Sequence, residues 1–371
     1  MNTFAGIPGP PPTFPFGNAL AFMGNKKRPW EVCADWGREY GGMTLVWLLG
    51  QPAIVLNDPQ LIGEVLETNW QAFYKDAPHD ALAPVIAPDN VFIANGDNWR
   101  FLRDNSPMCA DWFDGWLRSQ VPVIRDIVRR RVRTLAASGQ TVDLVDELRR
   151  LSYDVLSLTT WGREFGDRNY QNFLRLATVG SRRMNGPPPL SKLPPLLPSF
   201  YSARTEWYGD FSRALAEARR DVRPDATDLL RETLRRGTPL NDRQLAWGLA
   251  APVHFGGVFS LASALATTLY LLNQNPNAAQ AVDGEVSERV IGREPFDHAA
   301  LESCEQVDFA LREALRVSGP VPMYFRNVSR ENSVQLGGHT LPPNTLLFIT
   351  NWLLHRDPEH WPDADRFLPA R

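Results

Sequence analysis

Trp99 and Arg103 stand four residues apart, and both side chains donate hydrogen bonds. On a helix this spacing places the indole N–H and the guanidinium group on the same face. Because both groups donate, the pair suits an anionic carboxylate as its ligand. The alternative interpretation is a tryptophan in the core beside an arginine on the surface.

Glu313 and Arg316 carry opposite charges three residues apart, on one face of a predicted helix. Pairs of this kind are common on exposed helices, where each stabilises the helix by roughly 0.2–0.5 kcal/mol. A solvated pair is therefore the simplest interpretation of Glu313-Ala-Leu-Arg316 alone. If a further arginine shared the carboxylate in the interior, losing one member would leave a buried unpaired charge.

Two adjacent glycines, Gly256 and Gly257, fall inside a long segment with a helical pattern. Each costs about 1 kcal/mol relative to alanine in mid-helix. Such a cost is tolerated where a helix must widen or let a flat ligand approach. Beyond them, the hydroxyl of Ser260 could relay a proton or could bond back to its own helix. The neighbouring side chain, Phe259, cannot carry a proton.

The three cysteines, Cys33, Cys109 and Cys304, are widely spaced and form no CxxC or Cys/His pattern. We therefore expect reduced thiols in a cytoplasmic chain and no metal site built from motif ligands. Hydrophobic residues make up 43% of the 371 residues, which is enough for a large core. A formal net charge of −3 gives no reason to expect nucleic-acid binding.

The start of the chain, Ile7-Pro-Gly-Pro-Pro-Pro12, has no apolar run before it. It does not resemble a signal peptide or a membrane anchor. No later segment offers about 18 uncharged apolar residues in a row without proline, the length that a spanning helix needs. We expect a soluble protein with no membrane anchor and at most peripheral membrane contact.

The periodicity of apolar residues predicts a helix-dominated chain with a small sheet. The first 24 residues should be extended, and residues 43–49 and 52–56 should form a hairpin. A proline-rich loop is expected over residues 186–198. One long helix should run from residue 241 or 242 to residue 275, and further strands should lie near residues 333–336 and 346–349. The other expected helices cover residues 30–40, 58–67, 120–137, 144–160, 204–223, 227–236, 278–291 and 299–317.

Five elements follow one another in the last part of the chain: Glu313-Ala-Leu-Arg316, Pro320-Val-Pro322, Arg326, His355-Arg-Asp-Pro358 and Phe367-Leu-Pro-Ala-Arg371. As an ordered set they resemble the C-terminal half of the cytochrome P450 family, the haem-thiolate monooxygenases. The segment from Gly96 to Arg103 is similar to the family's propionate-binding helix. The resemblance covers nearly the whole chain. It implies a single domain over residues 1–371 with the mainly α cytochrome P450 fold and a small β region.

The resemblance also implies roles for individual residues. Trp99, Arg103 and Arg326 would bind the haem propionates, and Gly257 and Ser260 would line the oxygen side of the haem. Glu313, Arg316 and Arg371 would form a buried structural triad. Two departures are visible, because Phe259 and Ala370 stand where the family carries acids.

The function that the resemblance implies is oxidation of an apolar small molecule, with dioxygen and two electrons from a ferredoxin or a reductase. The family's cysteine ligand, with its glycine-rich loop and following helix, is expected a little beyond Arg371. Cys33, which we expect beside a surface helix turn, and the other two cysteines lack glycine-rich flanks. Two alternatives remain: a truncated, inactive product, or a haem-free binding or scaffold protein. The region from Leu174 to Tyr208 is expected to shape substrate access.

Overall fold

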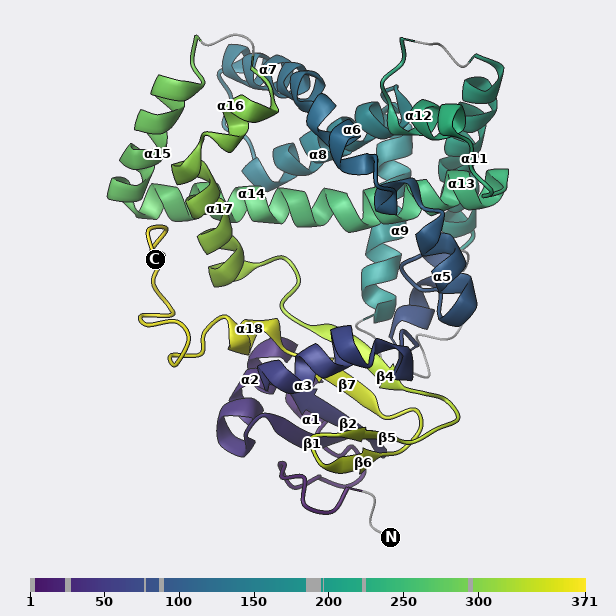
Figure 1. Cartoon of the computed structure of the whole chain (residues 1–371), viewed down its shortest axis with the longest axis vertical. Coiled ribbons are helices and arrows are strands. Elements are labelled where there is room, and N and C mark those ends of the chain that lie inside the picture. Colours follow the sequence, from purple (N-terminus) through teal and green to yellow (C-terminus); the bar gives the residue numbers. More distant parts are fainter. Residues whose placement is uncertain are drawn as a thin grey trace. The chain divides into compact units, whose positions relative to one another are not determined.

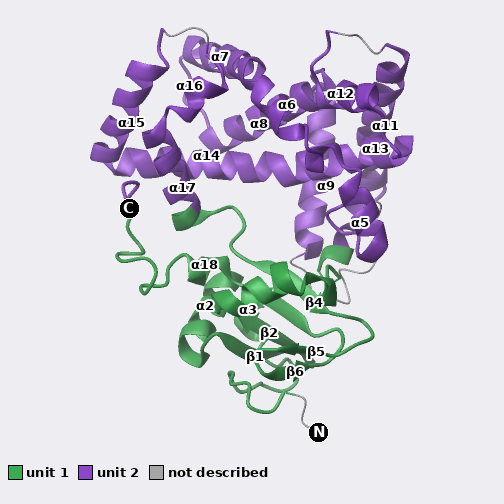
Figure 2. Ribbon diagram, viewed as in Figure 1, with its two compact units in different colours: residues 1–80, 316–366 green, residues 81–315, 367–371 purple. Residues whose placement is uncertain are grey.

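The computed structural model describes residues 4–23, 28–76, 78–86, 90–184, 195, 197–221, 225–292 and 296–371. Two compact units make up the chain, Met1–Asp80 with Arg316–Arg366, and Ala81–Leu315 with Phe367–Arg371 (Figure 2). The first unit holds the strands, and the second is built of helices (Figure 1). The expectation of a mainly helical chain with a small β region is confirmed.

The sheet of the first unit joins segments from distant parts of the chain. Its strand order is β1-β2-β7-β4-β3, with β2 parallel to β7 and β4 antiparallel to β7. A separate hairpin pairs β5 with β6. The predicted hairpin and the two later strands are confirmed, whereas β3, β4 and β6 have no counterpart in the sequence prediction. The strands are β1 Met43–Leu48, β2 Gln51–Leu56, β3 Phe73–Tyr74, β4 Tyr324–Val328, β5 Val334–Leu336, β6 His339–Leu341 and β7 Leu346–Ile349.

The central strands β2 and β7 are buried on both faces. Ile54 of β2 and Leu347 of β7 belong to one apolar cluster. The next residue of each strand, Val55 and Phe348, belongs to a second cluster. Because successive side chains of a strand point to opposite faces, a strand covered on both faces is a continuous apolar run rather than an alternating one.

Short helices flank this sheet: α1 Leu20–Met23, α2 Pro29–Tyr40, α3 Pro59–Gly63, extended by a π-helical turn at Glu64–Thr68, and α18 Asn351–Leu354. The presence of α1 corrects the expectation that the first 24 residues are extended throughout. Cys33 lies on the buried face of α2 beside Val32 and Trp36, in the second apolar cluster. Its expected place at a surface turn is therefore wrong, because the apolar stripe of α2 carries this residue inward.

The helices of the second unit pack around an aromatic core. Trp161, Trp207, Tyr153, Phe173 and Phe211 are fully buried there. The proline-rich loop predicted over residues 186–198 lies mostly outside the described residues, and Pro198 begins α11. The helices are α4 Ala83–Ile86, α5 Gly96–Asp104, α6 Phe113–Ser119, α7 Val121–Ser138, α8 Leu144–Trp161, α9 Asp167–Met184, α11 Pro198–Arg220, α12 Leu229–Arg236, α13 Asp242–Ala250, α14 Gly256–Gln274, α15 Pro276–Arg289, α16 His298–Glu302 and α17 Glu305–Ser318.

The long predicted helix forms as α13, a π-helical turn at Ala251–Phe255 and α14 in direct succession. Asn241 caps its start, because its side chain accepts the Gln244 N–H at 2.9 Å. Pro252 explains the wide turn. Proline has no N–H for the α-helical ladder, and its ring clashes with the carbonyl four residues earlier.

The segment Asp242–Gln274 is long and apolar enough to cross a bilayer, with a mean hydropathy of 1.6 in its most apolar window. The expectation from the sequence concerned an unbroken apolar run rather than an average, so the absence of a membrane anchor stays a prediction. Serine, threonine and histidine interrupt the apolar run in the sequence, but they leave the average hydropathy high. A core helix of a globular protein meets the same criterion, so length and composition do not by themselves place this helix in a membrane.

The helix predicted over residues 299–317 is interrupted between α16 and α17, which corrects the expectation of one continuous helix. The Ser303 hydroxyl donates to the Ala300 carbonyl at 2.7 Å, and the Cys304 thiol approaches the same oxygen at 3.4 Å. Side chains that bond to nearby carbonyls in this way offer the backbone an alternative to the helical ladder.

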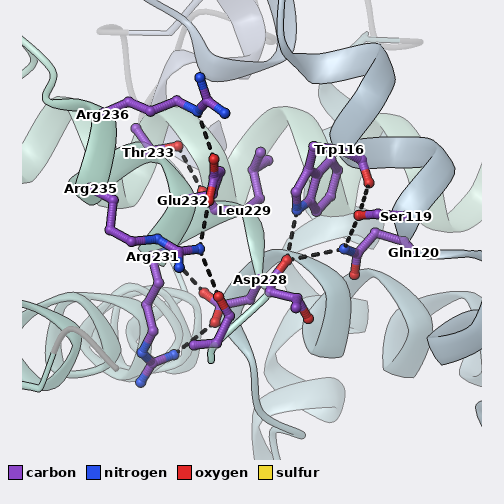
Figure 3. A network of polar contacts seen from close by, with 12 residues as sticks. Trp116, Ser119, Gln120, Asp228, Leu229, Arg231, Glu232, Thr233, Arg235 and Arg236 are labelled. Atoms are coloured by element: carbon purple, nitrogen blue, oxygen red, sulfur yellow. Dashed lines mark hydrogen bonds and ion pairs between the residues drawn. The ribbon is translucent and has the colours of Figure 1, made fainter. Parts of the chain in front are cut away.

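A polar network joins α6, α7 and α12 (Figure 3). The indole N–H of Trp116 and the amide of Gln120 both donate to the Thr227 carbonyl, at 2.7 and 3.0 Å. The next residue, Asp228, accepts the Arg231 backbone N–H at 3.0 Å and forms a buried ion pair with the Arg231 guanidinium at 3.0 Å. Asp228 therefore caps α12 and neutralises its own buried cation at once.

We predict that Asp228→Ala lowers the free energy of unfolding by about 3–5 kcal/mol, because it removes a cap and leaves the Arg231 guanidinium buried without its carboxylate. Urea unfolding followed by circular dichroism measures the change. The matched control is Asp242→Ala, which removes the exposed ion pair with Arg219 and should have little effect. Equal losses in the two variants would contradict the special role of the buried pair.

Candidate functional site

Trp99 and Arg103 lie on α5 of the second unit. Leu102 anchors this helix in the aromatic core, and Trp99 packs against the same core from its half-buried position. The guanidinium of Arg103 is exposed and lies over the Trp99 ring, 5.4 Å from its centroid. The spacing of four residues therefore does bring the two side chains together. Among the residues that the structure describes, no carboxylate forms an ion pair with Arg103.

Arg326 lies on β4 of the first unit and is half-buried. Its guanidinium donates to the Phe325 carbonyl at 2.7 Å, and within the described part of the chain no carboxylate pairs with it. Burial lowers the pKa of Arg326. Burial, together with the positive charge of Arg326, also lowers the pKa of the nearby His79 to about 4. A partly desolvated cation in this position lacks the carboxylate that a buried arginine normally has.

The donors of both units match the chemistry of a carboxylate ligand. A guanidinium forms two parallel hydrogen bonds to a carboxylate, and an indole N–H adds a third donor. Trp99, Arg103 and Arg326 are therefore suited to the propionate groups of a haem. The pair of Trp99 and Arg103 offers such donors in the second unit, and Arg326 offers them in the first.

The two glycines of α14 have different surroundings. A Cβ atom on Gly257 would lie 2.7 Å from the Leu156 side chain of α8, so a larger residue cannot enter there without a shift. A Cβ atom on Gly256 would meet nothing within 4 Å. Gly257 thus serves the close packing of α8 against α14, and Gly256 is the glycine beside open space. The role of Gly257 on the oxygen side of a haem stays a prediction.

Ser260 donates its hydroxyl to the carbonyls of its own helix, those of Gly256 and, at 3.1 Å, Gly257. Its oxygen keeps acceptor capacity in this arrangement. Phe259, in the place of the family's acid, stacks on Phe173 with 5.5 Å between ring centroids, and the Arg149 guanidinium lies 5.3 Å from its ring centroid. Residue 259 therefore makes packing and cation–π contacts with α8 and α9 and offers no titratable group.

Glu313 is a buried carboxylate on α17, 4% exposed. One of its oxygens accepts the Leu368 backbone N–H at 3.0 Å and pairs with Nε of Arg371 at 3.1 Å. Two donors on one desolvated oxygen hold the last residues of the chain against this helix. The tetrapeptide alone suggested a solvated pair, but burial of Glu313 excludes that interpretation.

Arg316 is also buried, at 5% exposure. Its guanidinium donates to three backbone carbonyls, those of His355, Ala364 and Arg366, at 2.7, 2.8 and 3.0 Å. The same group lies 5.3 Å from the centroid of the Trp361 ring. Arg316 therefore organises the irregular segment that contains the His355-Arg-Asp-Pro358 element. Its predicted sharing of the Glu313 carboxylate stays a prediction.

The three cysteines are free thiols in different surroundings. Burial raises the pKa of Cys33, which favours the neutral thiol over the metal-binding thiolate. Cys304 is buried and approaches the Ala300 carbonyl with its sulfur, and Cys109 is exposed on a short turn. Burial therefore disfavours Cys33 as an iron-binding thiolate.

Sequence reasoning missed three partners of these residues: Leu156 facing Gly257, Arg149 beside Phe259, and Trp361 under Arg316. Each partner lies far along the chain from the residue that it contacts, and no motif joins the two. The adjacent glycines were the one available signal for close helix packing at this point.

We predict that Glu313→Ala lowers the free energy of unfolding by about 3 kcal/mol, because Arg371 and the Leu368 amide lose a buried acceptor. Denaturant unfolding monitored by tryptophan fluorescence measures the loss. Asp308→Ala on the same helix is the control, because its ion pair with Arg312 is exposed. An unaltered unfolding curve for Glu313→Ala would return this residue to the solvated-pair interpretation.

Comparison with known proteins gives one consistent result. The family model described as "Cytochrome P450" matches residues 7–371, so it spans both units. Similar curated proteins include cytochrome P450 3A6 of Oryctolagus cuniculus (23% identical, 99% of this chain) and cytochrome P450 3A7 of Homo sapiens (25%, 99%). Premnaspirodiene oxygenase of Hyoscyamus muticus is 25% identical over 98% of this chain. The alignments cover 76% of each relative. The chain belongs to the cytochrome P450 family, whose fold it has and whose members are haem-dependent monooxygenases.

Proposed function

We propose that this chain binds haem through Trp99, Arg103 and Arg326 and takes part in the oxidation of an apolar small molecule. The observation that carries the proposal is Arg326, a half-buried guanidinium whose pKa burial lowers and which has no carboxylate partner among the described residues. An anionic ligand would supply the missing counter-charge. Haem, the cofactor that the family match implies, carries propionate groups that would supply this charge.

When bound, haem supplies an iron at which dioxygen is activated with electrons from a ferredoxin or a reductase. The chain's own residues have simpler tasks. Arg326 and the stacked pair of Trp99 and Arg103 hold the propionates. Gly256 leaves space beside α14, and Ser260 presents a hydroxyl oxygen that can accept a proton in a relay.

A second candidate function is a haem-free or inactive binding protein of the same fold. Phe259 favours it, because a stacked phenylalanine replaces the titratable group that proton delivery requires. Haem uptake by the purified chain distinguishes the proposed function from the haem-free form of this alternative, and turnover distinguishes it from the inactive form.

The finer assignments rest on more general support. Premnaspirodiene oxygenase, one of the relatives, is by its name an oxygenase of a small organic molecule, and this supports a substrate of that class. Three free cysteines suit a reducing compartment, which supports the proposal of a cytoplasmic location. We also propose a single domain over residues 1–371, because one family model covers both units.

We predict that the purified chain takes up one haem and that Arg326→Ala weakens haem binding by about tenfold, the loss of one charge-assisted contact worth about 1.4 kcal/mol. Titration of added hemin, followed by its absorption, measures the affinity. Arg330→Ala is the control in the same unit, because this exposed arginine is paired with Asp76. Arg103→Ala should also weaken binding, with Arg100→Ala as its control on α5.

Absence of haem uptake by the unaltered chain would support the haem-free alternative. Uptake with equal affinity in Arg326→Ala and Arg330→Ala would remove the propionate assignment of Arg326.

We further predict that the reduced, haem-loaded chain shows no thiolate-type absorption shift with carbon monoxide, because burial keeps Cys33 as a thiol and none of the three cysteines has the glycine-rich flanks of the family's ligand loop. A thiolate-type shift would show that one of the three cysteines binds the iron. Serine substitution of each cysteine in turn would then identify which one.

A further inference from the structure

His254 lies inside the π-helical turn that precedes the two glycines of α14. Its Nδ1 atom is 3.1 Å from the Ala250 carbonyl oxygen, one turn earlier in the same helix. A π-turn changes the regular pairing of backbone groups, and the imidazole adds a side-chain hydrogen bond to the backbone at this point. A carbonyl oxygen only accepts, so Nδ1 must carry the proton.

The other ring nitrogen of His254 faces the neighbouring helix. Nε2 is 3.2 Å from the hydroxyl oxygen of Ser157 on α8. Burial lowers the pKa of His254 to about 3, so the ring is neutral at ordinary pH. In a neutral imidazole with its proton on Nδ1, Nε2 is an acceptor, and the Ser157 hydroxyl therefore donates to it.

The surroundings of the imidazole exclude a catalytic serine–histidine pair. His254 and Ser157 are both fully buried. Aromatic rings enclose the imidazole, with centroid distances of 4.9 Å to Tyr153, 5.8 Å to Trp207 and 5.1 Å to Phe211. No substrate reaches the hydroxyl there, so the two hydrogen bonds must serve the arrangement of the helices.

A steric contact lies directly beside this polar one. Leu156 and Ser157 are consecutive on α8, and their partners Gly257 and His254 are one turn apart on the long helix. The Ser157 hydroxyl is hydrogen-bonded to His254, and the Leu156 side chain fills the space where a Cβ atom of Gly257 would lie. A rotation or a slide of α14 against α8 would break both contacts, so together they fix one setting of the two helices.

We propose that His254 is a positioning residue, which locks the π-helical turn to α8 and thereby directs Gly256 and Ser260 toward the oxygen side of the haem. The last clause rests on the proposed function, whereas the lock itself does not. The sequence offers no sign of it, since a histidine in an apolar helix resembles any buried polar residue.

The first test uses the unaltered chain without haem. Long-range ¹H–¹⁵N correlation spectra of the histidine rings distinguish the two neutral tautomers. We expect the His254 ring to carry its proton on Nδ1 at neutral pH, with its signals lost in His254→Asn. A neutral ring with its proton on Nε2 would overturn the proposal, because the unprotonated Nδ1 could not donate to the Ala250 carbonyl.

The second test separates positioning from stability. Ser157→Ala and His254→Leu should shift the backbone amide resonances of Gly256 and Ser260, and both should weaken hemin retention. His254→Asn keeps a hydrogen-bond donor near the Nδ1 position. Its Gly256 and Ser260 amide resonances and its hemin retention should therefore be closer to those of the unaltered chain than in His254→Leu. The control is Thr268→Val, which removes a buried hydroxyl bond to the Ala264 carbonyl farther along α14 and should leave those resonances in place.

Unchanged Gly256 and Ser260 resonances in folded Ser157→Ala would overturn the lock. Failure of the unaltered chain to retain hemin would count against the proposed function alone, because the tautomer and the amide resonances are measured without haem.

Discussion

The close approach of α8 and α14 is the constraint on which the described part of the second unit depends. Gly257 favours it, because a Cβ atom there would lie 2.7 Å from a terminal methyl group of Leu156, which would have to move. The π-helical turn at Pro252 sets the rotation of α14 just before that contact, and the aromatic core of α8, α9 and α11 closes around the same point. Protein interiors are packed as densely as crystals, so a helix pair held at this distance has few alternative settings.

Charge explains the remaining features of the site. In the second unit Asp228 neutralises Arg231, and Glu313 neutralises Arg371, as expected for ionic groups removed from water. Arg326 departs from this rule, since within the described residues it bonds to a backbone carbonyl alone. Arg316 shows that carbonyls can suffice when three of them converge. A single carbonyl is a poor substitute for a carboxylate, and this is the reason for proposing an anionic ligand at Arg326.

Elements with a strong apolar period could be predicted from the sequence, as α2, α7 and α8 show. Those that depend on distant partners could not. The strand β4 mixes Arg326 and Asn327 with apolar residues and exists because β7 and β3 pair with it. The spacing of Trp99 and Arg103 sufficed to place them on one face. Gly256, and not Gly257, faces open space because α8 packs against the side of the helix that carries Gly257. The sequence alone does not indicate on which side α8 packs.

The parallel pairing of β2 with β7 has a consequence for synthesis on the ribosome. Ala53 pairs with Leu346, so the central strand of this sheet emerges only after most of the chain has been translated. Until then β1 and β2 form at most a two-stranded hairpin, which is marginally stable by itself in water. The apolar residues of the first eighty positions must therefore stay exposed, or be sheltered by chaperones, while the helical unit is made.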